Sequence, residues 1–344
     1  MTRHYFITGG AGFIGANYVH RLLKRGEQVT LYDNLSRAGG RLNLTWLEDT
    51  FGKDSFQMIV GDVRDAALLA ESCREAEVIV HLAGQVAVTT SVTEPRADFE
   101  ANALGTFNAL EAARLSKRSP IFIFASTNKV YGAMDDLALV EELTRWRYAD
   151  LPFGCPETQP LDFHSPYGAS KGSGDQYTRD YARIYGLRTV VFRQSCIYGP
   201  RQFGMEDQGW LAWLTIAAVT GHPITIYGDG KQVRDILHID DLLDAYDAAV
   251  EKIETARGKI YNMGGGPDNI TSVWAEFGPR LEKLLGRSIK VQYAEARPGD
   301  QLVFYADIRK AQRELNWSPG INLDKGIERL YRWVDENKNY FQGK

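Results

Sequence analysis

Tyr167 and Lys171 are the residues of this sequence best placed for proton transfer. They lie in the segment SPYGASKGSGDQYTRDYARIYG, which runs to helix length after Pro166. On a helix, residues four positions apart share one face and lie about one turn apart. An ammonium group beside a phenol favours the phenolate and lowers the pKa of the phenol towards working pH. This pair could therefore take the proton of a sugar hydroxyl while the carbinol hydrogen leaves as a hydride.

Three polar residues, Thr127, Asn128 and Lys129, follow the apolar run Ile121–Ala125. The run predicts a buried strand, so the three side chains should lie at the end of that strand. Thr127 would supply a hydroxyl that holds the reacting oxygen. A Tyr-x-x-x-Lys pair alone occurs by chance in many helices, and it indicates catalysis only together with Thr127 and a cofactor fold. The alternative for Asn128 and Lys129 is that they are solvated loop residues.

A glycine cluster, TGGAGFIG, comes directly after the first predicted strand. Gly9, Gly12 and Gly15 recur at every third position, and Gly10 with the last two matches G-x-G-x-x-G. Glycines permit a tight turn, let the backbone approach a pyrophosphate and allow the helix to pack closely on the strand. The next segment has the apolar pattern of a helix, whose first N–H groups would bind phosphate. This order of strand, loop and helix predicts a dinucleotide site.

Acidic residues at the next two strand ends bear on which dinucleotide binds. Asp33 ends the second predicted strand, where a carboxylate accepts hydrogen bonds from the adenosine ribose and repels a 2′-phosphate. NAD is therefore expected rather than NADP, although Arg37 and Arg41 weaken this preference because arginine can accommodate that phosphate. Asp33 could alternatively cap a turn. Asp62, in GDVRD, could meet the adenine amino group or cap the next helix.

The elements that must position these residues follow from the pattern of apolar runs. Strand-like runs alternate with helix-length segments through the first 195 residues, and they are apolar nearly throughout, as expected of parallel strands covered on both faces. This alternation implies right-handed crossovers and an α/β fold with a doubly wound parallel sheet of the Rossmann type. The predicted strands are His4–Thr8, Val29–Tyr32, Phe56–Val60, Val78–Leu82, Ile121–Ala125 and Thr189–Arg193.

The remainder of the chain is more mixed, with turn signals such as YGDGKQ, NMGGGPDN and ARPGDQ. It predicts a smaller mixed α/β lobe packed over the carboxyl edge of the sheet. We assign residues 1–195 to the dinucleotide-binding domain, with 236–266 returning to it, and residues 196–344 to a discontinuous second lobe. The segment 133–163 is long for a connection and could be a lid or an oligomer contact.

Composition and charge exclude several classes of partner. The 344 residues are 44% hydrophobic and 24% charged, and a net charge of −4 without a basic tract argues against nucleic acid. The longest apolar run, Trp210–Val219, is too short to span a bilayer and predicts a buried helix. No secretory pattern opens the chain, so a cytoplasmic protein without membrane contact is expected. Cys73, Cys155, Cys196 and the scattered histidines lack metal-ligand spacing, so no metal is expected.

The motifs TGGAGFIG, GDVRD, HLAG, STNKVYG, SPYGASK, YGPRQ and QVRDILHIDD together resemble the extended short-chain dehydrogenases, the NAD-dependent nucleotide-sugar epimerases and dehydratases. The resemblance covers nearly the whole chain. It implies Thr127, Tyr167 and Lys171 as catalytic residues, and the second lobe as the nucleotide-sugar-binding lobe. Gly84 stands where many members have alanine, a departure that should leave the cofactor contact intact. The residues implied to bind NAD are Gly9, Gly12, Phe13, Ile14, Gly15, Asp33, Asn34, Arg37, Asp62, Val63, Leu82, Ala83, Gly84, Asn102 (a structural or cofactor-side amide), Tyr167 and Lys171.

The two residues after Thr127 bear on the reaction type. The 4,6-dehydratases of this family typically carry an Asp-Glu pair there, because elimination needs an acid for the leaving hydroxyl and a base for the adjacent carbon. This sequence has Asn128 and Lys129 instead. An amide transfers no proton at neutral pH, and one lysine cannot easily serve both roles. Epimerisation by oxidation and re-reduction of one carbinol is therefore favoured over dehydration.

The stretches STNKVYG, LDFHSPYGASKG, DQYTRDYARIYGLRTVVFRQSCIYGPRQFG and EDQGW closely resemble the CDP-paratose 2-epimerases. This resemblance implies transient oxidation at C2 of a CDP-linked dideoxyhexose by a tightly bound NAD that is regenerated in each turnover. A UDP-sugar 4-epimerase, or another nucleotide-sugar epimerase of the family, is the alternative enzyme. A non-catalytic NAD-sensing scaffold is the alternative of another class, and the intact catalytic residues argue against it. Family members commonly pair through the helix with the Tyr-Lys motif, which implies a homodimer or homotetramer.

The nucleotide end of the substrate needs cations, and arginines in turn-rich segments can bind a diphosphate bidentately. Arg234 and Arg297 are the first candidates, and Arg201 and Gln208 are further ones; a surface ion pair is the alternative for each arginine. Trp210 and Trp213 could stack on a base, but their helical spacing favours the core. The residues predicted to bind substrate are Gln85, Thr127, Asn128, Lys129, Cys196, Arg201, Gln208, Arg234 and Arg297.

Overall fold

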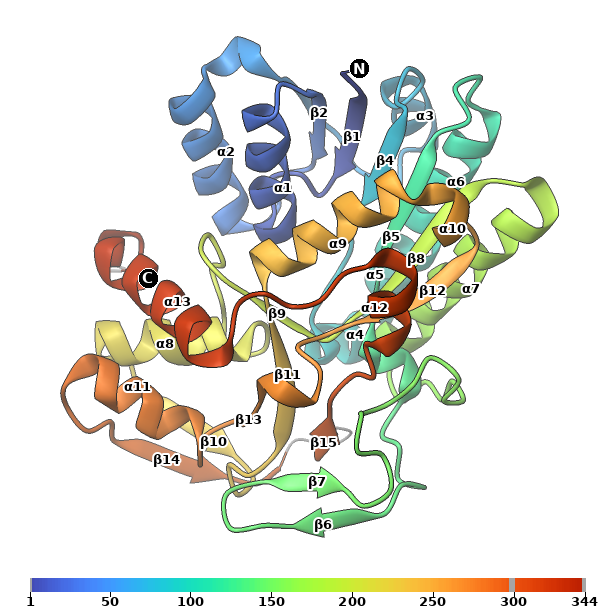
Figure 1. Cartoon of the computed structure of the whole chain (residues 1–344). Helices are drawn as coiled ribbons and strands as arrows, with labels where there is room; N and C mark the ends of the chain where they lie inside the picture. Colours follow the sequence, from blue (N-terminus) through green and yellow to red (C-terminus); the bar gives the residue numbers. More distant parts are fainter. Residues whose placement is uncertain (1, 297–300, 342–344) are drawn as a thin grey trace.

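A seven-stranded parallel sheet is the central element of the protein (Figure 1). The structure is a computed structural model that describes residues 2–296 and 301–341. Neighbouring strands follow the order β12-β8-β5-β4-β1-β2-β3. The strands are β1 (His4–Thr8), β2 (Gln28–Asp33), β3 (Gln57–Val60), β4 (Val78–His81), β5 (Ile121–Thr127), β8 (Arg188–Gln194) and β12 (Lys259–Met263). The predicted doubly wound parallel sheet is therefore confirmed.

Helices cover both faces of this sheet, which explains why its strands are apolar on both sides. One face packs against α1 (Phe13–Lys24), α2 (Ala38–Phe51) and α9 (Ile239–Glu251). The other packs against α3 (Ala66–Ser72), α6 (Gly105–Leu115) and α7 (Pro166–Tyr185). Along β4 the side chains alternate, so that Val80 enters the first core and Ile79 the second. The shorter helices of this part are α4 (Val88–Thr93), α5 (Pro95–Phe99), α10 (Ile253–Ala256) and α12 (Arg309–Leu315).

The carboxyl ends of β5 and β8 extend further than the sequence predicts. β5 was expected to end at Ala125, but it continues through Ser126 to Thr127, which pairs with Gln194 of β8. A 3₁₀ turn at Asn128–Tyr131 follows β5. Thr127 therefore belongs to the ordered edge of the sheet, and the polar residues after it turn away from the strand direction.

The second part of the chain forms smaller mixed sheets beside the carboxyl edge. In one sheet β11 pairs with one antiparallel strand and two parallel strands, and a second sheet joins two parallel strands. The strands are β9 (Cys196–Tyr198), β10 (Ile224–Tyr227), β11 (Val233–His238), β13 (Ile270–Ser272), β14 (Val291–Ala294) and β15 (Val303–Phe304). The helices are α8 (Trp210–Thr220), α11 (Phe277–Leu285) and α13 (Leu323–Glu336).

Helix α8 is the buried helix that the apolar run predicted. Leu211, Leu214 and Ile216 lie in the core of the second part, and Trp210 and Trp213 pack against that core. The ring of Trp210 meets Phe277 edge-to-face at 5.5 Å between centroids. The two tryptophans therefore have packing partners within the lobe.

The segment 133–163 contains the hairpin of β6 (Leu139–Glu141) and β7 (Trp146–Tyr148). Its backbone donates a hydrogen bond from Trp146 to the carbonyl of Lys231 at 3.2 Å. The Tyr148 hydroxyl donates to the Val303 carbonyl at 2.9 Å, and Arg145 pairs with Glu276 at 2.8 Å. These contacts hold the hairpin against the second part of the same chain.

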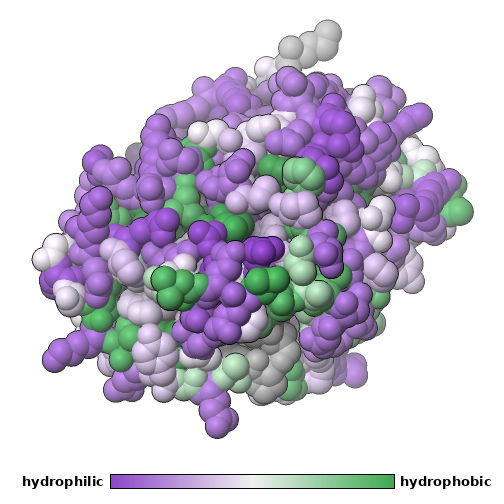
Figure 2. Space-filling model, turned by 60° about the horizontal axis from the view of Figure 1, so that its bottom comes forward, coloured by the Kyte–Doolittle hydropathy of each residue, from purple (hydrophilic) through white to green (hydrophobic). Residues whose placement is uncertain are grey.

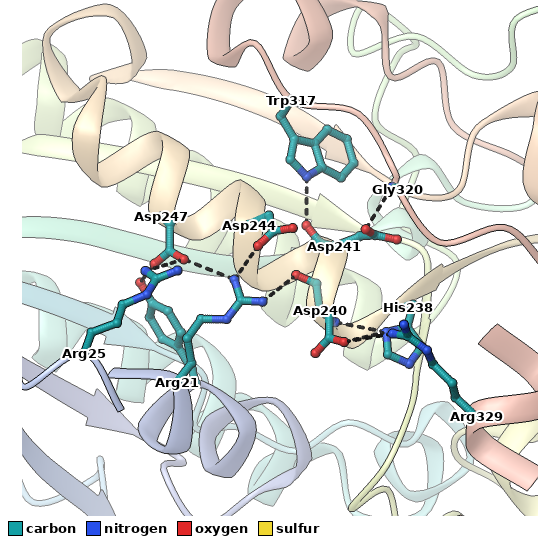
Figure 3. A network of polar contacts seen from close by, with 11 residues as sticks. Arg21, Arg25, His238, Asp240, Asp241, Asp244, Asp247, Trp317, Gly320 and Arg329 are labelled. Carbon is teal, nitrogen blue, oxygen red and sulfur yellow. Dashed lines mark hydrogen bonds and ion pairs between the residues drawn. The ribbon is translucent and has the colours of Figure 1, made fainter. Parts of the chain in front are cut away.

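A polar network joins the two parts at the start of α9 (Figure 3). Arg21 of α1 reaches Asp244 and Asp247 of α9, and the Asp247 contact measures 3.1 Å. At the other side of α9, the Asp241 carbonyl accepts a hydrogen bond from Trp317 at 2.8 Å, and its carboxylate accepts one from Gly320 at 2.9 Å. Arg21 also donates to the Asp240 carbonyl at 3.1 Å, so the motif QVRDILHIDD contacts α1 through Asp240 and the segment before α13 through Asp241.

Hydrophilic side chains predominate on the face shown in Figure 2, where hydrophobic residues lie singly or in small groups. No helix within the described ranges is both long and apolar enough to cross a bilayer.

Candidate active site

The glycine loop after β1 leaves no room for side chains. Gly9 has a φ of +68°, which favours glycine, and its N–H donates to the Tyr32 carbonyl at 2.8 Å. A Cβ on Gly15 would lie 2.3 Å from the Gly9 carbonyl oxygen. Helix α1 starts at Phe13, and no side chain caps the N–H groups of its first turn. A phosphate could bind to these groups.

Asp33 lies at the end of β2 beside the glycine loop. Its carboxylate accepts hydrogen bonds from the main-chain N–H groups of Ala11 at 3.1 Å and Leu35 at 2.8 Å. Burial raises the pKa of Asp33, while these bonds and the charge of Arg37 oppose that rise. Asp33 therefore caps the turn at Leu35, which was one alternative of the sequence analysis, and it also braces the glycine loop through Ala11. Its contact with the adenosine ribose stays a prediction.

Asp62 is not the cap of the next helix, because Asp65 has that role and accepts from the Leu68 N–H at 3.0 Å. Asp62 instead accepts from Asn34 at 2.8 Å and pairs with Arg64, whose guanidinium holds the pKa of that carboxyl well below its usual range. Asn34 and Asp62, both predicted to contact the cofactor, are thus brought together across β2 and β3.

Arg37 contacts Gln208, which the sequence assigned to the substrate. This hydrogen bond brings the loop before α8 to the start of α2, beside Asp33. Gln208 therefore lies with the residues predicted for the adenosine end of the cofactor.

The segment after β4 touches the glycine loop and Asn102. The Thr8 hydroxyl accepts from the N–H groups of Leu82 and Ala83, both at 3.2 Å. Asn102 lies in a π-helical turn, Glu100–Leu104, and its Nδ2 donates to the Gln85 carbonyl and to Asp98, both at 3.0 Å. Its Oδ1 is buried without a hydrogen-bond partner. π-Helical turns are frequent at functional sites.

Gly84 is more than the minor departure that the sequence suggested. A Cβ at this position would lie 2.4 Å from Asn102 Oδ1. The glycine therefore permits the close approach of the Asn102 amide, and an alanine would require that side chain to move.

The predicted catalytic residues come together where β5 meets the start of α7. Tyr167 is only 8% exposed, and it lies close enough to Thr127 for that hydroxyl to lower the pKa of the phenol. Ser165 caps α7 by accepting from the Gly168 N–H at 3.0 Å, and Pro166 occupies the first turn of the helix. The cap fixes the start of α7 and with it the position of the phenol.

The predicted lowering of the Tyr167 pKa is wrong for this structure. Burial raises the pKa of Tyr167 to about 12; the Thr127 hydroxyl opposes the rise and the Asp98 charge adds to it. Lys171 Nζ instead lies 4.3 Å from the centre of the Phe124 ring. Burial lowers the pKa of Lys171 to about 8, against the charges of Asp175 and Asp98.

Two buried carboxylates that the sequence analysis missed support this site. Asp98 accepts from Ser170, the neighbour of Lys171, at 2.6 Å. Asp175 forms a buried ion pair with Arg193 at 2.9 Å and accepts from Ser126, the neighbour of Thr127, at 2.8 Å. Asp175 follows Lys171 by four positions on α7, and that spacing was the available signal for it.

Asn128 and Lys129 converge on a residue that the sequence analysis also missed. Gln301, which is 1% exposed, accepts from Asn128 Nδ2 at 3.0 Å and from Lys129 Nζ at 3.3 Å. The glutamine is the last residue of the predicted turn segment ARPGDQ, which was the available signal for its position. Asn128 is buried, so the solvated-loop alternative fails for that residue.

Cys196 and Arg234, predicted to bind substrate, lie near Lys129. The Cys196 thiol accepts from Trp210 Nε1 at 3.3 Å. Burial raises its pKa, and the nearby charges of Arg234 and Lys129 oppose that rise. The Arg234 side chain is 5% exposed and donates to the Val233 carbonyl at 2.7 Å.

The structure does not bring Arg201 to this group. Its guanidinium lies 4.2 Å from the ring centre of Trp46 in α2 and 5.9 Å from that of Trp333 in α13. Its φ of +69° turns the chain towards these helices. Gln85 donates to the Ala87 carbonyl at 2.6 Å. Arg297 lies outside the described residues.

The other residues predicted for the cofactor line the first part of the fold. Val63 is buried between β3 and α3, while Phe13 and Ile14 of α1 and Leu82 after β4 are half-buried against a core cluster. Within residues 2–296 and 301–341, no three His, Cys, Asp or Glu side chains are grouped so that they could hold a metal ion.

Comparison with known proteins agrees with this geometry. The family described as GDP-mannose 4,6 dehydratase matches residues 6–330. The chain therefore belongs to the NAD-dependent nucleotide-sugar epimerase/dehydratase family of enzymes.

One curated relative and two solved structures illustrate the similarity. The chain is 42% identical over 341 residues to the CDP-paratose 2-epimerase of Salmonella typhi, covering 95% of this chain and 98% of that protein. The UDP-glucuronic acid 4-epimerase of Bacillus cereus, in complex with UDP-glucuronic acid and NAD, matches with a TM-score of 0.83 at 29% identity, covering 97% of this chain and 99% of that one. The dTDP-glucose 4,6-dehydratase of Streptomyces venezuelae, with NAD bound, has a TM-score of 0.83 at 30% identity, covering 98% and 99%.

Proposed function

We propose that this protein inverts C2 of a CDP-linked sugar, converting CDP-paratose to CDP-tyvelose. The observation that carries the proposal is the pair Asn128–Lys129, whose side chains both bind the neutral amide of Gln301. An eliminating enzyme would need an acid and a base at these two positions. The 42% identity to a CDP-paratose 2-epimerase supports the choice of substrate.

The residues of the first part fit NAD. The glycine loop excludes side chains at Gly15, the first N–H groups of α1 lack a side-chain cap, and the Asp33 carboxylate lies beside both. The buried Asn102 Oδ1 without a partner marks a polar position next to the loop, in the turn predicted to contact the cofactor. When bound, NAD supplies a hydride acceptor and a positive charge that favours the phenolate of Tyr167.

Three side chains of this chain would move and hold the proton. Tyr167 takes the proton of the C2 hydroxyl and later returns it, so it acts first as a base and then as an acid. Lys171 is protonated below about pH 8, and it would hold the tyrosinate and the nicotinamide ribose once NAD is bound. Thr127 hydrogen-bonds the reacting oxygen. The 2-keto sugar then presents its other face to the returning hydride, and no net oxidation occurs.

The test is the position of inversion. The purified protein is incubated with CDP-paratose, CDP-tyvelose and UDP-galactose, and the products are read by NMR. Interconversion of the two CDP-sugars is expected. Inversion at C4 of the UDP-sugar with both CDP-sugars untouched would instead identify the 4-epimerase, which the similarity to a UDP-glucuronic acid 4-epimerase makes the second candidate.

The retained cofactor has its own test. Denatured protein should release NAD or NADH in a one-to-one ratio with the chain. Protein that is purified without bound NAD and consumes added NAD in step with product would contradict a returned hydride.

The role of Tyr167 can be tested by substitution. Tyr167→Phe should keep the bound NAD and lose most turnover, and full activity of that variant would show that Tyr167 does not have this role. A protein that binds NAD but turns over none of these sugars would favour the NAD-sensing scaffold.

A further inference from the structure

Gln301 connects the second part of the chain to the end of β5. It precedes β15, and its buried amide makes three hydrogen bonds. Nε2 donates to the Gly132 carbonyl, while Oε1 accepts from Asn128 Nδ2 at 3.0 Å and from Lys129 Nζ at 3.3 Å. One side chain thus ties both ends of the 3₁₀ turn that follows Thr127.

The partners determine which way each amide points. A main-chain carbonyl can only accept, and an ammonium group can only donate. Gln301 must therefore turn its NH₂ to Gly132 and its oxygen to Lys129. Because that oxygen only accepts, Asn128 must turn its own NH₂ to Gln301. The oxygen of Asn128 is then left facing Thr127, whose hydroxyl donates to it at 3.4 Å.

This orientation decides what the Thr127 hydroxyl can do. Its oxygen already accepts from the Lys129 main-chain N–H at 3.2 Å. A hydroxyl has two acceptor positions, so one remains for the phenol of Tyr167. If the Asn128 amide were reversed, its NH₂ would donate to Thr127 and occupy that second position. The long 3.4 Å bond to Asn128 also leaves the Thr127 proton free to turn towards a carbonyl oxygen.

We propose that Gln301 is a positioning residue, which holds the Asn128 amide so that the Thr127 oxygen keeps an acceptor position for the phenol of Tyr167. This inference rests on the proposed function, in which that phenol exchanges a proton with the sugar. It assigns Asn128 a positive role beyond the absence of a carboxylate. It also explains why a residue from the second part, 173 positions along the chain from Asn128, must be in place before the catalytic residues are set.

The experiment is a double-mutant cycle on turnover. In Gln301→Met, which has a similar volume and no amide, kcat should fall about tenfold. KM and the content of bound NAD should change less than about twofold. In an Asn128→Ala background the same substitution should change kcat less than about twofold, because the amide through which it acts is gone. Equal losses in both backgrounds, or a Gln301→Met enzyme with full kcat, would overturn the proposal.

Two further measurements keep the test decisive. Gln57→Met, at the amino end of β3, controls for loss of a glutamine elsewhere and should retain full kcat. If Gln301→Met does not fold, Gln301→Glu keeps the acceptor for Asn128 but replaces the bond to Gly132 with repulsion between two oxygens. Because the contact to Asn128 is kept, this variant should retain at least a third of kcat. A folded Gln301→Glu enzyme with a larger loss would contradict the proposed route through Asn128.

A substrate-free measurement separates this proposal from the proposed function. The side-chain NH₂ signals of Asn128 in a ¹⁵N spectrum of the NAD-bound protein are assigned by their absence in Asn128→Ala. They should shift in Gln301→Met and stay unchanged in Gln57→Met. Unshifted signals would refute the Gln301–Asn128 contact even if CDP-sugars are turned over. Shifted signals in a protein that inverts no CDP-sugar would refute only the proposed substrate.

Discussion

The close approach of Gly84 to Asn102 makes a stability prediction that can be worked through. In Gly84→Ala the new Cβ would lie 2.4 Å from Asn102 Oδ1, so the amide must move. Moving it weakens the hydrogen bonds from Asn102 Nδ2 to the Gln85 carbonyl and to Asp98, both 3.0 Å long. No other atom outside its immediate neighbours lies within 3.4 Å of that Cβ, so the Asn102 side chain accounts for the whole effect.

The magnitude follows from these two bonds. The bond to a carbonyl contributes about 1 kcal/mol and the bond to a carboxylate about 1.5–3 kcal/mol. Both hydrogen bonds are weakened rather than removed when the Asn102 side chain shifts, so the folded protein loses about 2–3 kcal/mol of stability. Gly84 does not have a positive φ, so alanine restricts the unfolded chain and returns about 0.4–1 kcal/mol. The net destabilisation is about 2 kcal/mol, or roughly 3 °C in Tm for a chain of this length.

The assay is urea unfolding of the wild type, Gly84→Ala, Asn102→Ala and the double variant. Gly84→Ala should lower the free energy of unfolding in the wild type. In the Asn102→Ala background it should be neutral or slightly stabilising, because nothing is left to displace. A Gly84→Ala protein as stable as the wild type, or one equally destabilised in both backgrounds, would refute the steric explanation.

Three further predictions concern buried charges and the surface. Burial raises the pKa of Asp235 to about 6, so the contribution of its carboxyl group to stability is complete below about pH 4 and is lost as pH rises through 6. Relative to Asp235→Asn, the free energy of unfolding of the wild type should fall by about 3 kcal/mol between pH 4 and pH 6. A difference between the two proteins that does not change with pH would contradict this prediction. Arg193→Met leaves the buried Asp175 carboxylate without its cation and should lower the free energy of unfolding by about 3–5 kcal/mol. Adding Asp175→Leu should restore much of this loss. Thermal unfolding of Arg193→Met at the wild-type temperature would disprove a stabilising role of the ion pair. The sequence predicts an oligomer that pairs through α7, and Phe107 of α6 and Tyr177 of α7 are exposed and meet edge-to-face at 6.0 Å. Phe107→Glu should therefore shift sedimentation from a dimer to a monomer, and a wild type that sediments as a monomer would contradict this prediction.

Features that depend on the spacing of residues close together in the sequence could be predicted. The parallel strands are covered on both faces, so the centres of β1, β4 and β8 stand out as short apolar runs. The spacing of Gly9, Gly12 and Gly15 has one main physical use, a tight turn between strand and helix. The four-residue spacing of Tyr167 and Lys171 likewise survives in the structure as a shared, buried position on α7.

Features that depend on packing between distant segments could not be predicted. The high pKa of Tyr167 arises from burial and from Asp98, which α5 brings to α7, and neither is visible from the helix itself. Arg201 lies in a motif predicted to contact substrate, yet its guanidinium packs on the Trp46 ring. Gln301 reaches the end of β5 from a region without hydrophobic periodicity. In such a region sequence patterns locate the turns but do not show which distant residues the turns contact.

The ribosome synthesises strand β12 long after its partner strand β8. Strand β12 pairs with β8 from Val190 to Gln194, yet it is translated only after β9, β10 and β11. At ordinary rates of synthesis the apolar edge of β8 stays unpaired for roughly 3 to 14 s after it leaves the ribosome. An unpaired apolar edge is a template for association with other chains. The nascent protein is therefore most exposed to misassembly between the synthesis of Gln194 and that of Met263, and chaperone occupancy on the ribosome should be greatest in that interval.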